Sequence, residues 1–363
     1  MEVGPMKISL LKREPINREK NGLTYHLKQA NHLKLWATTN NVPHLIFYGP
    51  SGAGKKTRIK CFLRELYGPG AERTHMLMKS FTTPSNKKLE IQTISSNYHI
   101  ELSPSDVGVY DRVVVQDVIK EMAQTSQIDA ASQKSFKVVV LCEADFLTRD
   151  AQDGLRRTME KYQHNCRLIL CCENYSRIIE PLQSRCIAVN VAAPTDEQVA
   201  NIVENVCQAE RVGIPRNVLQ QIVEKSSGNL RRALLMVEAT RMQDDSGTIP
   251  ADANVPVPEW ETYLKETAEM ILKKQSSDTL FKVRTRIYEI LSRCIPPQIV
   301  FDRLLDELLP ACDDVIVPQI VSESANFEHR LLLGQKPIFH IEAFIAAFMD
   351  IYLTHLTNAK RVK

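Results

Sequence analysis

Residues 49–57 form the part of the sequence with the clearest potential for chemistry. They read GPSGAGKKT, between the apolar run HLIFY and the helical pattern RIKCFLREL. Gly49, Gly52 and Gly54 allow the backbone to wrap a phosphate chain with its N–H groups pointing inward, and the N-terminus of the following helix adds partial positive charge. Lys55 is placed to reach the terminal phosphates. This order of strand, glycine loop, lysine and helix predicts a P-loop, since a flexible turn that happens to contain glycines explains neither the flanks nor the lysine.

The hydroxyl that should follow the loop lysine and hold Mg²⁺ is missing. Lys56 occupies that position, and Thr57 comes one residue later. Because one residue turns a helix by roughly 100°, we expect Thr57 to point away from the metal position. A solvated surface lysine is the plain interpretation of Lys56, but the hydroxyl ligand is lost either way.

The acids that would complete an ATPase site are also incomplete. The apolar run 137–141 ends in Cys142-Glu143-Ala144-Asp145, where such sites carry a metal-binding acid followed by an acid that polarises the attacking water. Cys142 replaces the first acid, and a cysteine has little affinity for Mg²⁺. Glu143 remains as a vestigial Walker B acid, either a possible base or a structural hydrogen-bonding group. We therefore expect no metal ion here and deficient hydrolysis.

The surrounding sequence alternates between strands and helices. The runs 44–48, 137–141 and 167–172 are short and rich in Val, Ile or Leu, as strands covered on both faces by helices are. Residues 23–192 are therefore predicted to form an α/β P-loop core with a parallel sheet. Polar or glycine-rich residues follow each strand, where open sheets of this class bind ligands.

A small helical domain is predicted at residues 193–243. Thr195 and Gln198 form a T-x-x-Q capping box at the start of its first helix. Two further helices are predicted near 216–226 and 230–242 from their apolar spacing.

The rest of the chain is predicted to be a linker and a second helical domain. Residues 244–258 contain three prolines and little apolar periodicity, as a linker does. Residues 259–363 are helical again. The broad apolar stripe at 338–352 fits a buried core helix or a helix that also contacts a partner. Residues 1–22 form a divergent N-terminal segment.

Composition says more about the cellular compartment of the protein than about its binding partner. The 363 residues are 44% hydrophobic and 25% charged, with a net charge of +3 that does not by itself indicate nucleic acid. Most of the nine cysteines lie in apolar runs, which favours the reducing cytosol or nucleus over a disulfide framework. No apolar run approaches the roughly 18 to 20 residues of a membrane helix, and residues 1–15 lack the apolar core of a secretory signal. We therefore expect a soluble intracellular protein.

Three downstream segments carry a family resemblance. Residues 150–162 read DAQDGLRRTMEKY, 167–186 read RLILCCENYSRIIEPLQSRC, and 228–233 read GNLRRA. In this order and spacing, they resemble the small subunits of replication factor C, the eukaryotic sliding-clamp loader of the AAA+ class. GKKT, ISSNYH at 94–99 and CIPPQI at 294–299 resemble its subunit 3 branch. The resemblance spans about residues 23–355 and implies a P-loop AAA+ core, a helical lid and an all-α collar for oligomerisation.

The resemblance implies a heteropentamer that uses ATP to open a sliding clamp and load it on primed DNA in the nucleus, for replication and repair. The partners would be four other clamp-loader subunits, the clamp and primer-template DNA. Arg185 of the SRC motif would be an arginine finger for the neighbouring ATP site, or else an ordinary surface arginine. Arg231 would be the sensor 2 residue at the nucleotide phosphates, or a lid arginine capping a helix. Arg112 and Lys120 are candidates for DNA binding, which needs only positive charge.

Three departures from the family pattern affect the nucleotide. Glu173 stands at sensor 1, where an asparagine is usual, and would repel a phosphate. KREPINREKN at 12–21 replaces the residues that line the adenine pocket, so binding of ATP or ADP is itself open. Asn229 replaces an acid, and we expect little effect. The leading interpretation is a regulatory subunit; the alternatives are an active Mg-ATP hydrolase using Thr57 and Glu143, or an ATPase-dead scaffold of an alternative clamp loader.

Overall fold

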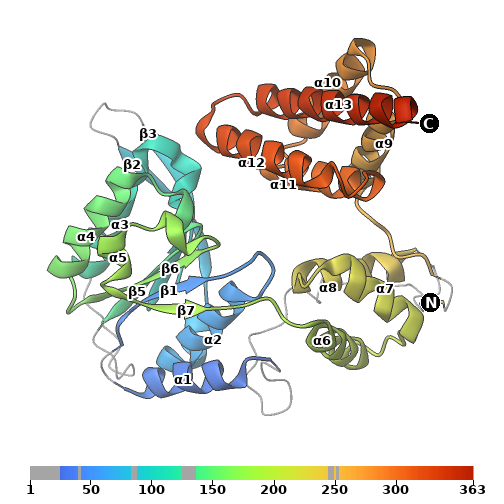
Figure 1. Cartoon of the computed structure of the whole chain (residues 1–363). Helices are drawn as coiled ribbons and strands as arrows, with labels where there is room; N and C mark the ends of the chain where they lie inside the picture. The colour runs from blue at the N-terminus through green and yellow to red at the C-terminus, as the bar shows by residue number, and fades with distance from the viewer. Residues whose placement is uncertain are drawn as a thin grey trace. The chain divides into compact units, whose positions relative to one another are not determined.

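The computed structural model describes residues 25–39, 42–82, 88–124, 136–243, 249–250 and 253–362. The chain divides into two compact units, residues 1–255 and 256–363 (Figure 1). The expected N-terminal segment at 1–22 lies outside the described residues, as does part of the expected linker at 244–258.

The first unit is built around a seven-stranded sheet of order β2-β3-β4-β5-β6-β1-β7. Five neighbouring strands, β4-β5-β6-β1-β7, pair in parallel. The sheet is mixed rather than parallel throughout, because β2 and β3 form an antiparallel hairpin that the sequence analysis did not predict. The strands are β1 (His44–Tyr48), β2 (His75–Thr82), β3 (Lys88–Ser95), β4 (His99–Leu102), β5 (Lys137–Leu141), β6 (Cys166–Cys172) and β7 (Cys186–Asn190).

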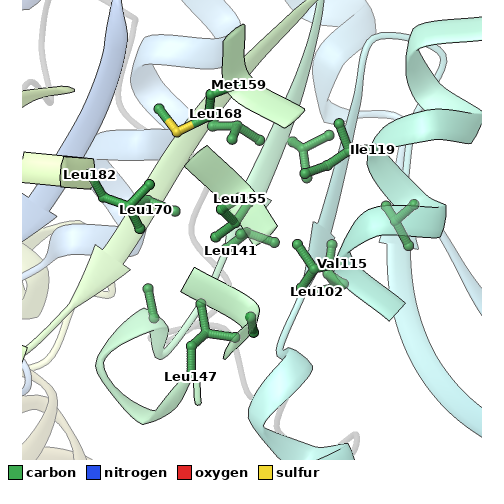
Figure 2. Close-up of a cluster of buried hydrophobic side chains, with 14 of the residues drawn as sticks. Leu102, Val115, Ile119, Leu141, Leu147, Leu155, Met159, Leu168, Leu170 and Leu182 are labelled. Carbon is green, nitrogen blue, oxygen red and sulfur yellow. The ribbon is translucent and has the colours of Figure 1, made fainter. Parts of the chain in front are cut away.

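Helices cover both faces of this sheet (Figure 1). Alternate residues of each central strand enter two separate apolar cores, so that Ile46 packs on the side of α3 and α4, and Leu45 on the side of α1 and α2. Figure 2 shows the first core, where Val115 and Ile119 of α3 and Leu155 of α4 meet strand residues. The helices are α1 (Leu27–Thr38), α2 (Lys55–Tyr67), α3 (Asp111–Gln124), α4 (Arg149–Lys161) and the short α5 (Glu180–Gln183).

A small helical lid follows β7 within the same unit. It consists of α6 (Asp196–Ala209), α7 (Arg216–Ser226) and α8 (Leu230–Met242). Thr195 and Gln198 make both hydrogen bonds of the capping box at the start of α6. Ile249 and Val255, which lie in the expected linker, are buried in the apolar core of the lid. Part of that segment is therefore packed rather than a free connection.

The second unit is entirely helical among its described residues. Its helices are α9 (Glu259–Lys273), α10 (Ser277–Ser292), α11 (Pro297–Leu308), α12 (Val317–Leu333) and α13 (Pro337–Val362). By length and composition alone, residues 337–357 are long and apolar enough to cross a membrane. However, Ile341, Phe344, Ile345 and Phe348 are buried in the core that α13 shares with the other helices, while Phe339 is exposed. The burial of these residues is that of a helix in the core of the second unit, which explains the apolar composition of α13. The predicted fold class, an α/β P-loop core with a helical lid and an all-α C-terminal domain, is confirmed.

Candidate nucleotide site and the opposite sheet edge

The P-loop connects β1 to α2 in a conformation that only glycines adopt without strain. Gly49, Gly52 and Gly54 have φ angles of 146°, 74° and 83°. A Cβ atom on Gly49 would lie 2.0 Å from the carbonyl oxygen of Val191, just after β7. The loop therefore needs glycine at this position both for its backbone angle and for its close approach to the neighbouring chain.

Lys55 lies inside this loop. Its side chain is buried, and its Nζ donates to the carbonyl oxygens of Gly49 at 2.6 Å and Pro50 at 2.9 Å. A phosphate would replace these carbonyls as the partner of the ammonium, because a charge-assisted bond between two ions is stronger. The loop has the backbone and the lysine needed to bind phosphate.

Lys56 is exposed in the first turn of α2, and Cys142, which influences its pKa, directly follows β5. The Cys142 thiol donates to Glu101 Oε1 at 3.4 Å, and Glu101 belongs to the adjacent strand β4. Burial works to lower the pKa of Lys56, but Cys142 and Glu101 beside it outweigh this and raise the pKa. Burial, with the nearby Glu101 carboxylate, raises the pKa of Cys142 to about 12, so its thiol stays neutral at physiological pH. The negative charge that Lys56 meets is therefore that of Glu101.

These residues do not fit Mg²⁺. The metal requires an octahedral set of oxygen ligands, and this position offers an ammonium and a thiol. The carboxylate of Glu101 already accepts from the Cys142 thiol. Within the part of the chain that the structure describes, no group of three or more His, Cys, Asp or Glu side chains is arranged to hold a metal ion. Thr57 is exposed on α2.

The two acids that follow Cys142 have different environments. Glu143 is exposed and has a φ angle of 53°, a strained conformation for a residue with a side chain. Asp145 is buried, and its Oδ2 accepts from the backbone N–H groups of Glu173 and Asn174 at 3.2 and 3.3 Å. These two hydrogen bonds hold the turn after β6 against Asp145. The Glu173 side chain itself is exposed.

The lid contacts the P-loop through Asn229. This residue caps α8 by accepting from the backbone N–H of Arg232 at 3.1 Å. A Cβ atom on Gly52 would lie 1.8 Å from Asn229 Oδ1, so the two residues are packed tightly. The short capping side chain of Asn229 therefore packs α8 against the loop, and the expectation that replacing an acid here has little effect stays a prediction. Arg231 is exposed in the first turn of this helix.

Tyr25 is a second connection between the lid and the loop. Its hydroxyl donates to the carbonyl oxygen of Ala53 at 2.7 Å, while its ring is buried in the apolar core of the lid. The Arg58 guanidinium packs over this ring at 4.7 Å and donates to the Tyr25 carbonyl at 3.2 Å. The loop, the start of α2 and the lid are therefore joined by one aromatic residue.

Arg185 lies at the opposite edge of the sheet from the P-loop. It precedes β7, which runs parallel to β1 with Cys186 paired to His44, whereas the P-loop follows Tyr48 at the other end of β1 (Figure 1). A strand of five residues at about 3.3 Å per residue separates the two positions by about 16 Å. An arginine side chain cannot span that distance, so Arg185 does not act on its own loop.

The Arg185 guanidinium is held in place by polar contacts. Its Nε and Nη2 donate to Glu160 Oε1 at 3.0 and 2.7 Å, and its Nη1 donates to the Pro181 carbonyl at 2.7 Å. Glu160 lies in the last turn of α4. The buried Gln152 of the same helix accepts from the backbone N–H of Ile179 at 2.9 Å, which ties α4 to the segment leading to Arg185. The guanidinium is therefore pre-oriented at the edge of the unit.

Comparisons with known proteins agree with this architecture. Family models match three stretches: replication factor C subunit 3, C-terminal domain, at residues 260–356; the RCF1/5-like AAA+ ATPase lid domain at 201–242; and DNA polymerase III, delta subunit, at 25–195. Replication factor C subunit 3 from Bos taurus is 51% identical over 91% of this chain and 92% of that protein. The Homo sapiens protein is 50% identical with the same coverage, and subunit 5 from Schizosaccharomyces pombe is 44% identical over 91% and 93%. The chain belongs to the replication factor C subunit 3/5 family. The resemblance inferred from its motifs is confirmed.

The two candidate DNA-binding residues of this replication factor C subunit 3/5 chain lie on α3. Arg112 and Lys120 are both exposed, eight residues apart on the helix, which is about 12 Å along its axis. The stem of Arg112 packs near Gly154 of α4. The structure brings the two cations onto one helix but not into contact with the P-loop residues.

Three residues of the site are not indicated by any motif in the sequence: Glu101, Tyr25 and Glu160. Each lies on an element other than the motif it contacts, so motif spacing does not reveal it. Glu101 left one signal, since it is an acid inside a short strand whose other residues are buried. Tyr25 and Glu160 left none that distinguishes them from ordinary residues of their segments.

Proposed function

We propose that this chain is a regulatory subunit of a heteropentameric clamp loader that opens a sliding clamp and loads it on primed DNA in the nucleus, for replication and repair. Its own site holds ATP or ADP without hydrolysing it, and Arg185 serves the ATP site of a neighbouring subunit. The observation that carries the proposal is that Arg185 is pre-oriented at the sheet edge opposite a P-loop that lacks its metal ligands.

The geometry of its own loop supports nucleotide retention without turnover. Lys55 and the loop backbone are arranged for phosphate, and the lid reaches the loop through Asn229 and Tyr25. The groups that would hold Mg²⁺ are replaced by Lys56 and Cys142. Hydrolysis in P-loop ATPases depends on that metal to neutralise the charge that develops on the phosphoryl group. Glu143 therefore has no activated reaction to assist in this site, and Arg231 is left as a phosphate contact from the lid.

Arg185 has the properties of an arginine finger. Its guanidinium is planar and permanently charged, and it can form two parallel hydrogen bonds to a phosphate. A γ-phosphate from a neighbour would compete for it with Glu160, whose carboxylate holds it at 2.7 Å in the free chain. Exchanging the Glu160 carboxylate for a phosphate as the partner of Arg185 costs little free energy, because the ion pair with Glu160 is partly exposed.

The second unit is proposed to assemble the ring as a collar, and α3 to face the DNA. Phe281 and Tyr288 are exposed aromatic residues seven positions apart on α10, so they lie on one face of the helix, where a partner could cover them. Arg112 and Lys120 supply positive charge that can track a phosphate backbone without reading sequence.

The proposal is tested by coexpression with the four other subunits of a replication factor C complex. We expect the full chain to co-elute with them as a pentamer that loads the clamp on primed DNA, and a chain ending at residue 258 to remain soluble but unassembled. A full chain that forms no such complex would contradict the proposal. Magnesium-dependent phosphate release by the purified chain would instead support the active hydrolase, and an assembled complex that cannot load the clamp would support the scaffold of an alternative loader.

A further inference from the structure

The residue that caps α8 of the lid lies directly against the P-loop. An ideal Cβ atom built on Gly52 would lie 1.8 Å from Asn229 Oδ1, 2.3 Å from its Cγ and 2.8 Å from its Nδ2. The whole carboxamide of Asn229 is therefore in contact with the backbone of Gly52. This glycine belongs to the loop segment whose N–H groups would point at a bound phosphate. Asn229 thus lies next to the place where the loop would hold a phosphate.

The two polar atoms of this carboxamide have different roles. The backbone N–H of Arg232 donates to Oδ1 at 3.1 Å, which assigns the carbonyl oxygen to the cap of α8. Within the part of the chain that the structure describes, Nδ2 makes no hydrogen bond. The side chain is only half-buried, and an amide nitrogen carries two N–H donors. Asn229 therefore has unused donors at the surface of the loop.

Two helix N-termini meet at this loop. Gly54 is the N-cap of α2, and Asn229 is the N-cap of α8. Because Asn229 touches Gly52, the two N-caps lie close together. Each N-terminus carries a partial positive charge of about half an elementary charge. Both first turns are described, and neither contains an acidic residue. The two helices therefore add to the positive charge of Lys55 without a carboxylate in either turn to oppose it.

We propose that Asn229 is a ligand of the nucleotide phosphates, donating from Nδ2 while Oδ1 remains in the cap of α8. This inference rests on the proposed nucleotide-holding role and names a lid residue that retains the nucleotide. An aspartate here would keep the cap, but it would offer no donor and would place a negative charge beside a phosphate. The motif alone predicts little effect of this exchange, so Asn229→Asp decides between the two predictions.

The same residue would link the ligand to the position of the lid. Oδ1 is bonded to α8, and the carboxamide rests on the loop, so a phosphate that accepts from Nδ2 would hold α8 against the loop. A ligand that binds one arrangement of two segments better than another stabilises that arrangement. ADP should therefore slow hydrogen exchange of the backbone amides in the first turn of α8, including that of Arg232.

The test is calorimetric titration of the full-length chain with ADP, and separately with ATP. Asn229→Asp should weaken binding by roughly 10- to 100-fold, through the lost donor and the added charge. Asn229→Ser keeps a capping oxygen and stays neutral, but it removes Nδ2 and should weaken binding by roughly 3- to 20-fold. Asn201→Asp adds the same charge at an exposed position of α6 and should leave binding unchanged.

Salt and hydrogen exchange separate a ligand from a merely structural cap. Higher ionic strength screens the added charge, so the loss in Asn229→Asp should shrink toward that in Asn229→Ser. Protection of the first turn of α8 by ADP should be smaller in Asn229→Ser than in the wild-type chain. Melting temperatures identify a variant that fails to fold. If Asn229→Ser fails, Asn229→Asp decides, because aspartate caps a helix as well as asparagine does.

The inference would be overturned by an Asn229→Ser variant that binds ADP like the wild-type chain, or by an Asn229→Asp variant that binds like Asn201→Asp. The same preparations are tested for assembly with the other four subunits. A wild-type chain that assembles and binds ADP, with both Asn229 variants unaffected, would reject the role of Asn229 alone. No binding of ADP or ATP to the wild-type chain would reject the inference together with nucleotide retention, and failure to assemble would reject the proposed function.

Discussion

The two edges of the sheet in the first unit hold their cations in different environments. At the edge that carries the P-loop, Lys55 is buried and donates to two loop carbonyls. At the other edge, Arg185 is partly exposed and donates to the Glu160 carboxylate and the Pro181 carbonyl. Since about one strand length separates the edges, one can lose its metal ligands without disturbing the other. The residues proposed for the chain's own nucleotide and those proposed for a neighbour's nucleotide can therefore change independently.

The largest expected effect comes from Arg185→Ala in the assembled pentamer. Arginine fingers contribute about 10³ to 10⁵ in rate, roughly 4 to 7 kcal/mol, through contacts made mainly in the transition state. Only the site that receives the finger should lose turnover, so steady-state ATPase with clamp and primed DNA should fall in part while assembly stays intact. Arg73→Ala, at another exposed arginine of the unit, is the matched control. Unchanged turnover in the assembled mutant would return Arg185 to the ordinary surface arginines.

Gly52→Ala should affect the P-loop edge alone. The residue has a φ angle of 74°, and its new Cβ would meet Asn229 Oδ1. We expect a loss of about 1–3 kcal/mol in stability, which corresponds to a few degrees in the melting temperature of a unit of this size. Asn229→Gly in the same chain should restore part of the loss. A variant as stable as wild type would mean that the lid does not pack on the loop in solution.

Glu160→Gln should have a smaller effect at the opposite edge. The ion pair with Arg185 is partly exposed, and such pairs contribute about 0.2–1 kcal/mol. Loss of the pre-oriented guanidinium should lower turnover at the one site that receives Arg185 by roughly two- to fivefold, so that pentamer ATPase falls by less than in Arg185→Ala. Increased turnover would contradict this expectation and indicate that competition between Glu160 and the phosphate outweighs the orienting effect of Glu160 on Arg185.

The smallest effect is expected from Lys55→Ala. In the chain's own site, Lys56 and Cys142 replace the residues that bind Mg²⁺ in a P-loop ATPase. Clamp loading by the pentamer should therefore change by less than about twofold. The measurement is loading rate, compared with the equivalent substitution in a neighbouring subunit. A loss as large as in that neighbour would show that both edges of this chain support catalysis.

Local sequence determined the strands and helices that carry the motifs. The predicted strands 44–48 and 137–141 coincide with β1 and β5, and the predicted helices 216–226 and 230–242 with α7 and α8. Periodicity and capping act within one element, so they can be read without knowledge of the fold. The loss of the Mg²⁺ hydroxyl at Lys56 is likewise a property of the sequence alone.

Only the tertiary structure decided which side chains meet. Cys142 and Glu101 come together because β4 and β5 pair in parallel. The position of Arg185 opposite the loop follows from the parallel pairing of β7 with β1, which no local pattern specifies. The β2–β3 hairpin was missed because residues such as Met76 and Met78 are exposed and do not alternate with polar residues as a half-buried strand does. Contacts between distant segments depend on strand order, and strand order is set by the packing of the whole sheet.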